Sequence, residues 1–158
     1  MNLYSKAEIK ALNGKFWELF RQRCKAHPKL RDKKKNFILH RTKIRGIAFR
    51  FEITRTDAKV MLELHHRNED TRLKAFELLD NYKSIIENGF ENGLIWEFYH
   101  QREDSGQEVC RIYTLMKGAN IHEQTKWPEI YNFFIDNMLQ LEDNFNEISD
   151  IIREALQG

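Results

Sequence analysis

The chain has 158 residues and a formal net charge of +2, which fits one domain of ordinary size. A domain of this length buries enough surface to fold without a disulfide framework or a structural metal. We therefore expect a single domain over residues 1–158 and no cofactor.

The first predicted element is a helix that begins at Ser5 and ends near Cys24. Ser5 and Glu8 have the spacing of a capping box, in which the serine side chain caps the first turn. Apolar residues recur at helical intervals after them, and Pro28 follows where the helix should stop.

Residues 29–46 are basic and show no regular apolar period, but the following residues alternate with a period of two. Apolar and polar side chains alternate over residues 47–53 and again over 60–64, with a polar break at residues 55–57. This pattern predicts two antiparallel strands, each with one face in the core and one polar face outside.

A second helix is predicted from Asp70 or Thr71 to Gly89, where a glycine can end a helix. Residues 94–99 and 109–116 then have the composition of a third and a fourth strand, and the turn between them falls at residues 103–106.

The last predicted element is a helix from Pro128 to about Leu156, with apolar positions spaced alternately by four and three residues. A helix of this length reaches about 45 Å, so it must either bend or lean on a neighbour. Such a stripe is more often core than interface, but Phe133 and Ile135 lie off it and need cover, so a homodimer through this helix is the alternative interpretation.

Together these elements predict an α+β fold. An antiparallel sheet of about four strands is packed by an N-terminal helix, a middle helix and a long C-terminal helix.

Several apolar and aromatic landmarks carry a family resemblance. They are residues 39–53, Phe16-Trp17, residues 58–60, 94–96 and 111–113, and Trp127-Pro128. With them the chain resembles the bacterial family catalogued as domain of unknown function 4268 over nearly its whole length. Members of that family are often attached to nuclease-like domains or encoded near defence genes, so the resemblance implies a role connected with nucleic acids. It supplies no catalytic residues.

The charge is concentrated in one segment. Between Arg21 and Lys59 there are fourteen Lys or Arg and three acids, a net of +11, so the other residues sum to −9. Basic side chains that neutralise phosphates give proteins affinity for nucleic acid. The candidate residues for binding DNA or RNA are Lys33, Lys34, Lys35, Arg41, Lys43, Arg45 and Arg50. The alternative is a solvated segment that balances the acidic remainder of the chain, within one chain or between two.

Asp57-Ala58-Lys59 matches the acid-x-Lys half of a metal-dependent nuclease signature, with Glu52 as the earlier acid. The signature requires the triplet on a strand, whereas the sequence places it in the turn between two strands, so we favour no catalytic role for it.

Glu63 and His65 are expected on one strand face, where a carboxylate and an imidazole can share a metal. Without a further ligand pair, a polar outer strand face is the preferred interpretation, and no metal site is expected. The sequence also contains no glycine-rich phosphate loop, nucleophile elbow or Cys-x-x-Cys motif.

Cys24 and Cys110 are expected to be buried free thiols, which indicates a reducing compartment. The N-terminus does not have the pattern of a signal peptide, and no apolar run is long enough to span a membrane. We therefore expect a cytoplasmic protein without a membrane partner.

For function, the sequence favours a non-catalytic binding or accessory module that contacts nucleic acid through its basic N-terminal face. The alternatives are a homo-oligomeric interaction domain and, less favoured, a metal-dependent nuclease.

Overall fold

A four-stranded antiparallel sheet with the order β1-β2-β4-β3 forms the centre of the structure. The computed structural model describes residues 4–31 and 42–157. The strands are β1 (Ile47–Ile53), β2 (Asp57–Leu64), β3 (Ile95–Gln101) and β4 (Glu108–Lys117). The four predicted strands pair as two hairpins, β1–β2 and β3–β4, and the α+β class is confirmed.

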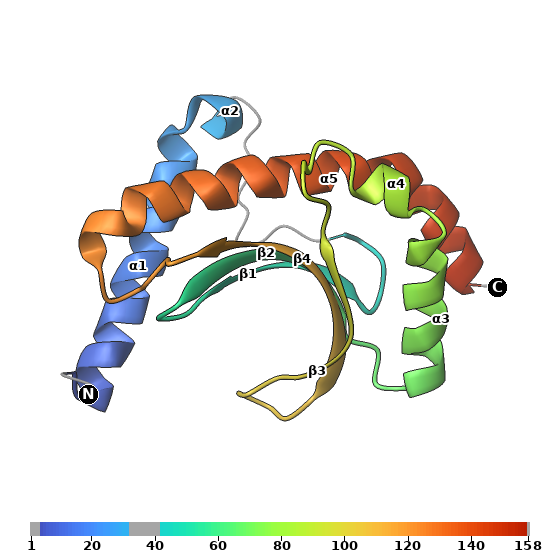
Figure 1. Ribbon diagram of the computed structural model, residues 1–158, viewed down its shortest axis with the longest axis horizontal. Coiled ribbons are helices and arrows are strands. Elements are labelled where there is room, and N and C mark those ends of the chain that lie inside the picture. Colours follow the sequence, from blue (N-terminus) through green and yellow to red (C-terminus); the bar gives the residue numbers. More distant parts are fainter. Residues whose placement is uncertain (1–3, 32–41, 158) are drawn as a thin grey trace.

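The helices of the described residues gather on the convex face of this strongly curved sheet. They are α1 (Lys6–Ala26), the short α2 (Pro28–Arg31), α3 (Glu69–Asp80), α4 (Lys83–Ile86), the 3-10 turn η2 (Gln124–Lys126) and α5 (Trp127–Gln157). Figure 1 shows α5 arching over the sheet, with α1 near one end of it and α3 near the other, while the concave face is left without a helix.

The N-terminal cap is the one that the sequence predicted, whereas the cap of the middle helix is not. The Ser5 hydroxyl accepts a hydrogen bond from the backbone N–H of Glu8 at 3.2 Å. The middle helix begins earlier than expected, because Asn68 caps it by accepting from the N–H of Thr71 at 3.0 Å.

The predicted middle helix is also wrong in its extent, since it is broken into α3 and α4 around Asn81 and Tyr82. The second piece is held by the long helix. The side-chain amide of Asn144 in α5 donates to the carbonyl oxygens of Ile86 at 2.8 Å and Asn88 at 2.6 Å. These bonds satisfy carbonyls at the end of α4 and tie it to α5.

Of the two possibilities for the long helix, the structure shows bending: α5 follows the curved sheet and turns down beside α3 (Figure 1). Pro128 lies in its first turn, as predicted. Ile135, which we expected to need cover from a second copy, is fully buried inside the chain, and Phe133 packs partly buried against the core. Ile135 therefore needs no cover from a second copy, and Phe133 is already partly covered within the chain.

The core between sheet and helices is rich in aromatic rings. Phe16 and Phe20 of α1 and Phe134 of α5 are fully buried, and the ring centroid of Phe134 lies 6.2 Å from that of Phe16 and 5.5 Å from that of Phe20. The hydroxyl of Tyr131 donates to the backbone carbonyl of Phe16 at 2.7 Å, which ties α1 to α5. Burial raises the pKa of Tyr131 well above its ordinary value.

Strand β2 departs from the sequence prediction in the burial of its second face. Its apolar face is buried against the helices, as expected. The opposite face was expected to be a polar surface, yet Lys59 is 8% exposed and Glu63 only 2% exposed. The curvature of the sheet explains this, because neighbouring strands close over the middle of the concave face.

Cys24 and Cys110 are both buried free thiols, as the sequence indicated. No helix in residues 4–31 or 42–157 is both long and apolar enough to cross a lipid bilayer.

Candidate functional site

A pocket of about 790 Å³ lies where the chain enters β1, leaves β2 and begins α3. We call it the basic pocket. Its charged lining residues among those described are Lys43, Arg45, Arg67 and Arg153, and none of the described lining residues is acidic. Arg153 is paired with the exposed Asp150 at 2.6 Å. No carboxylate of the described residues lies within 4.0 Å of the other three cations.

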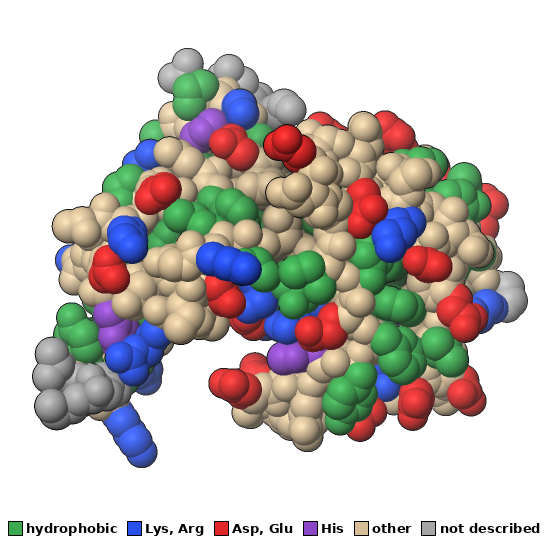
Figure 2. All heavy atoms as spheres, in the orientation of Figure 1, with side chains coloured by type: hydrophobic (Ala, Val, Ile, Leu, Met, Phe, Trp, Pro, Cys, Tyr) green, Lys and Arg blue, Asp and Glu red, His purple; other side chains and the backbone are tan. Residues whose placement is uncertain are grey.

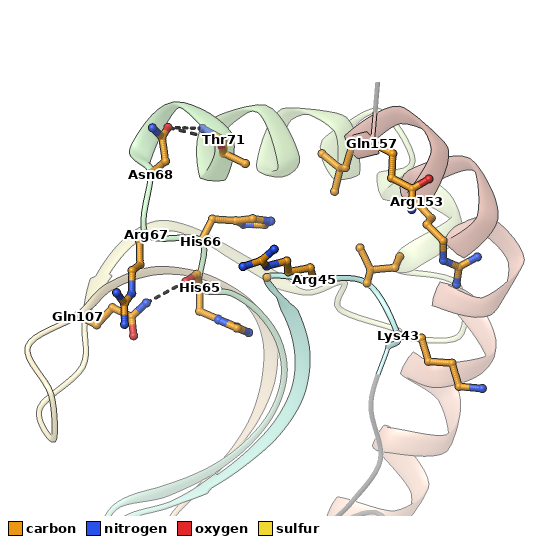
Figure 3. Close-up of a pocket in the computed structure, with 13 residues that line it drawn as sticks. Lys43, Arg45, His65, His66, Arg67, Asn68, Thr71, Gln107, Arg153 and Gln157 are labelled. Carbon is orange, nitrogen blue, oxygen red and sulfur yellow. Dashed lines mark hydrogen bonds between the residues drawn. The ribbon is translucent and has the colours of Figure 1, made fainter.

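The cations are spread along the basic pocket. In Figure 3, Arg67 lies beside Gln107 at one end, Lys43 and Arg153 lie at the other, and Arg45 lies between them near His66. The four cations come from three separate parts of the chain. Their positive potential therefore extends along the pocket instead of concentrating at one point.

The backbone around the basic pocket is fixed by side-chain hydrogen bonds. Arg72 of α3 donates to the carbonyl of His66 at 2.7 Å, and Gln107 donates to the carbonyl of His65 at 2.8 Å. Both bonds hold the segment that carries Arg67 in place after β2 ends.

The opposite wall is fixed in a similar way. Lys43 adopts a φ of 63°, in the left-handed region that residues other than glycine use sparingly. The hydroxyl of Thr42 stabilises this turn by donating to the carbonyl of Ile47 at 2.6 Å and accepting from the N–H of Ile44 at 3.1 Å.

His66 is a neutral wall of the basic pocket. Burial lowers its pKa below the ordinary value of 6.5, and the neighbouring charge of His65 lowers it further. Its Nδ1 atom is buried without a hydrogen-bond partner among the described residues, and its ring lies against Gly46. At neutral pH the ring is therefore uncharged, and it contributes to the wall of the basic pocket but not to its positive charge.

The seven residues that the sequence suggested for nucleic-acid binding fall into three groups. Lys33, Lys34, Lys35 and Arg41 lie outside the described residues. Lys43 and Arg45 line the basic pocket. Arg50 points to the concave face of the sheet, where it pairs with Glu63 at 3.2 Å.

Sequence reasoning missed Arg67 and Arg153, which complete the basic pocket. Arg67 lies just outside the segment of high positive charge, and Arg153 belongs to the acidic C-terminal part of the sequence. No local sequence signal connects the two residues, because only the fold brings the segment after β2, which carries Arg67, near the end of α5, which carries Arg153.

The concave face of the sheet forms a second hollow of about 760 Å³, which we call the charged hollow. Figure 2 shows it below the body of the molecule, with side chains of both signs on its walls. The residues at the start of α1 and those around the β3–β4 turn line its two sides.

Two ion clusters occupy the floor of the charged hollow. In the first, Lys59 contacts Asp57 at 2.9 Å and Glu52 at 3.0 Å, and Arg111 contacts Glu52 at 3.5 Å and Glu97 at 3.0 Å. These we call the Lys59 cluster.

In the second, which we call the Glu63 cluster, the carboxylate of Glu63 accepts hydrogen bonds from Arg50 and Arg102. Each nearly buried charge of the hollow thus has two partners of opposite sign, which offsets the cost of removing it from water.

The expected position of the nuclease-like triplet is corrected by the structure. Asp57 and Lys59 belong to β2 and point into the charged hollow, and Glu52 is the cross-strand neighbour of Lys59. Burial of Lys59 acts to lower its pKa, but its hydrogen bonds with Asp57 and Glu52 outweigh burial and raise the pKa. The ammonium group thus occupies the space between the two carboxylates that a divalent cation would need.

Glu63 and His65 do not share a ligand position. Strand β2 ends at Leu64, and His65 lines the basic pocket while Glu63 faces the charged hollow. Within the described part of the chain, no group of three or more His, Cys, Asp or Glu could hold a metal ion.

The comparison with protein families agrees with the resemblance of the aromatic and apolar landmarks. The family described as Domain of unknown function (DUF4268) matches residues 12–149. The chain belongs to this family. The match begins within α1 and ends within α5, so it includes the whole sheet, but Arg153 of the basic pocket lies beyond it. No curated protein and no solved structure matches the chain significantly.

Proposed function

We propose that this chain is a non-catalytic module that binds nucleic acid through the phosphate backbone, and that the basic pocket is the contact surface. The observation that carries the proposal is the grouping of Lys43, Arg45, Arg67 and Arg153 around one hollow that no described acidic side chain lines. Cations that neutralise phosphates release condensed counterions, which supplies affinity without reading sequence.

The spread of the cations favours a tract of successive phosphates over a single anion. Arg67, Arg45 and Arg153 follow one another along the basic pocket (Figure 3). The N-terminus of α3 adds little attraction, because Glu69 and Asp70 occupy its first turn.

The lining also indicates which part of a nucleic acid is read. Among the described lining residues there is no Phe, Tyr or Trp on which an unpaired base could stack. Asn68, Thr71, Gln107 and Gln157 offer neutral polar groups, which suit contacts to phosphate and sugar oxygens. We therefore expect duplex binding with little dependence on base sequence.

The test is a titration of a labelled 20-base-pair DNA duplex with the purified chain between about 50 and 200 mM salt. Three to four phosphate contacts give a slope of about −3 to −4 in log K against log salt. Arg45→Ala and Arg67→Ala should each reduce the magnitude of the slope by about 0.9 and weaken unrelated sequences equally.

Arg55→Ala is the matched control, because Arg55 is an exposed arginine in the β1–β2 turn, outside the basic pocket. It should leave the slope unchanged. A double variant of Arg45 and Arg67 that binds DNA with the slope of the original chain would contradict the proposal.

A further inference from the structure

A groove of about 680 Å³ lies between the second half of α1 and the start of α5. We call it the α1 groove. Its apolar residues that are open to solvent are Leu19, Ala26, Pro28 and Pro128, and Leu19 is 37% exposed. A groove of this size with exposed apolar side chains is a candidate contact surface.

The cations of the α1 groove have neutral partners. Lys15 donates to the side-chain oxygen of Gln124 at 3.0 Å, and Arg23 donates to that of Asn132 at 3.2 Å. Within the part of the chain that the structure describes, no carboxylate lies within 4.0 Å of either cation. None of the described lining residues is acidic, so the groove has a positive potential.

The acids on the helices around the α1 groove do not cancel this potential. Glu18 of α1 is paired with Arg21 at 2.6 Å, and Asp136 of α5 is paired with Lys29 at 3.1 Å. Glu129 is exposed in the first turn of α5, but it does not line the groove. The occupant that fits the groove therefore combines apolar and acidic side chains.

The order of side chains along α1 defines this fit more closely. Lys15, Leu19 and Arg23 are spaced by four residues, so they follow one another on one side of the helix. At ~1.5 Å per residue the two cations lie about 12 Å apart along the helix axis. The exposed leucine lies midway between them.

The last part of α5 has the same order with the opposite charge. Ile151 is 48% exposed, and Glu147 and Glu154 lie four residues before and three residues after it on the same side of the helix. Asp150 is already paired with Arg153 at 2.6 Å, but no described cation lies within 4.0 Å of either glutamate. The two glutamates are about 10 Å apart along the axis, close to the separation of the cations.

These two surfaces cannot meet within one chain. Figure 1 shows α1 beside the beginning of α5, whereas the end of α5 lies beside α3 at the opposite side of the molecule. A contact between them therefore requires two copies of the chain.

We propose that the α1 groove binds the last part of α5 from a second copy of this chain. Ile151 packs against Leu19, and the glutamates on either side of Ile151 pair with Lys15 and Arg23. The apolar contact supplies affinity, and the ion pairs set the position of one helix on the other. Because the contact joins two different surfaces, it either occurs twice about a two-fold axis or repeats head to tail. It uses no residue of the basic pocket, so it goes beyond nucleic-acid binding.

The test is the mass of the full chain in solution, measured by light scattering at about 50 and 500 mM salt. Nucleic acid is removed first, because it would bridge copies through the basic pocket. We expect a mass above that of one chain at low salt and a fall toward one chain at high salt, since salt screens exposed ion pairs.

Two charge-reversal variants identify the surfaces. Lys15→Glu/Arg23→Glu places acids against acids, and Glu147→Lys/Glu154→Lys places cations against cations, so each variant alone should be monomeric at low salt. An equimolar mixture of the two should associate again, because each then meets opposite charges on the other. The matched control is Lys6→Glu/Lys10→Glu, which changes the net charge equally at exposed positions of α1 outside the groove and should still associate.

The apolar part of the contact has its own variant. Ile151→Ala should weaken self-association about tenfold, whereas Leu73→Ala, which removes a leucine that is 36% exposed on α3, should leave it unchanged. Far-UV circular dichroism of every variant checks that its helix content is kept. A chain that is monomeric at low salt would overturn the proposal. Reversal variants that remain associated, or a mixture of them that remains monomeric, would overturn it as well.

Discussion

Arg102, which follows β3, donates from its Nε to Glu63 Oε2 in β2 at 3.3 Å, across 39 residues of sequence. The Nη2 atom of Arg102 also donates to the same carboxylate, at its Oε1 atom. Strand β4 lies between β2 and β3 in the sheet, so this bond reaches over a strand instead of joining neighbours. It therefore holds the β3–β4 hairpin curled over the concave face.

Replacing Glu63 by Ala should lower the free energy of unfolding by about 2–3 kcal/mol in urea denaturation. Loss of one partner from a buried ion pair typically costs ~3–5 kcal/mol, and the partial exposure of Arg50 and Arg102 lets water reduce that cost. The control Glu103→Ala removes an exposed carboxylate of the same hairpin and should stay within about 0.5 kcal/mol. Equal effects of the two substitutions would show that the bond does not hold the hairpin.

Phe134→Ala should be among the most damaging substitutions in the core, at about 3–5 kcal/mol. The ring is fully buried and its centroid lies 4.7 Å from that of Phe51 and 5.5 Å from that of Phe20. Phe98 on β3 is the matched control, since its ring is 39% exposed and its removal opens no enclosed cavity. Thermal or urea unfolding of both variants checks the difference, and a smaller loss for Phe134 than for Phe98 would contradict this packing.

Gly46→Ala should destabilise the chain more than Gly118→Ala does. Both glycines have positive φ, 85° and 82°, so each substitution adds backbone strain of roughly 1–2 kcal/mol. A Cβ at Gly46 would also lie on the ring of His66, whereas one at Gly118 meets nothing within 4 Å. We expect an additional cost of ~1–3 kcal/mol at Gly46 from this overlap.

The additional cost at Gly46 should largely disappear when His66→Ala is combined with Gly46→Ala. Urea denaturation of the four variants measures it as a coupling free energy. Independent, additive effects would mean that the ring does not pack on the glycine.

The two buried thiols predict a loss of stability at alkaline pH. Burial raises the pKa of Cys24 from 9.0 to about 12 and that of Cys110 to about 11. Because these folded-state pKa values are raised, their contribution is complete below pH 9 and is lost as the pH rises toward the folded values. At pH 10 the unfolded chain gains about 1 kcal/mol from each ionised thiol.

The measurement is the free energy of unfolding of the chain and of the variant Cys24→Ala/Cys110→Ala at pH 8 and pH 10, both under reducing conditions. The variant should lose about 2–3 kcal/mol less than the original chain over this interval. Comparing the change in the free energy of unfolding between the two pH values cancels the stability that the smaller alanine side chains lose at every pH. Identical slopes would show that the thiols ionise in the folded state.

Local sequence patterns predicted most of the elements because each depends on neighbouring residues. The alternation over β1 and β2 identified the strands and the face that packs on the helices, and the Ser5 cap is a bond between residues three apart. The break between α3 and α4 could not be found in this way. Nor could the contact that ties α4 to the long helix, in which Asn144, more than fifty residues away, satisfies the carbonyls at the end of α4.

The candidate sites were predictable only in part, because they too depend on contacts between residues that are distant in the sequence. The segment of high positive charge gave Lys43 and Arg45, but it also suggested Arg50, which the strand turns to the other hollow. The Asp57-Ala58-Lys59 triplet was noticed in the sequence, yet the contacts of Lys59 and Arg111 with Glu52 follow from strand pairing.

The sequence by itself determined the α+β class, the order of its main helices and strands, and which face of each strand is apolar, because these follow from the period of side chains along a local backbone. The tertiary structure alone decided the curvature of the sheet. That curvature buries Lys59, Glu63 and Arg111 on the concave face, which the sequence pattern predicts to be polar and exposed to solvent. Curvature arises from contacts among β2, β4, the β3–β4 hairpin and the arching α5, and no single segment encodes it. The same holds for the basic pocket, whose cations meet only when α5 has brought the end of the chain back beside the start of β1.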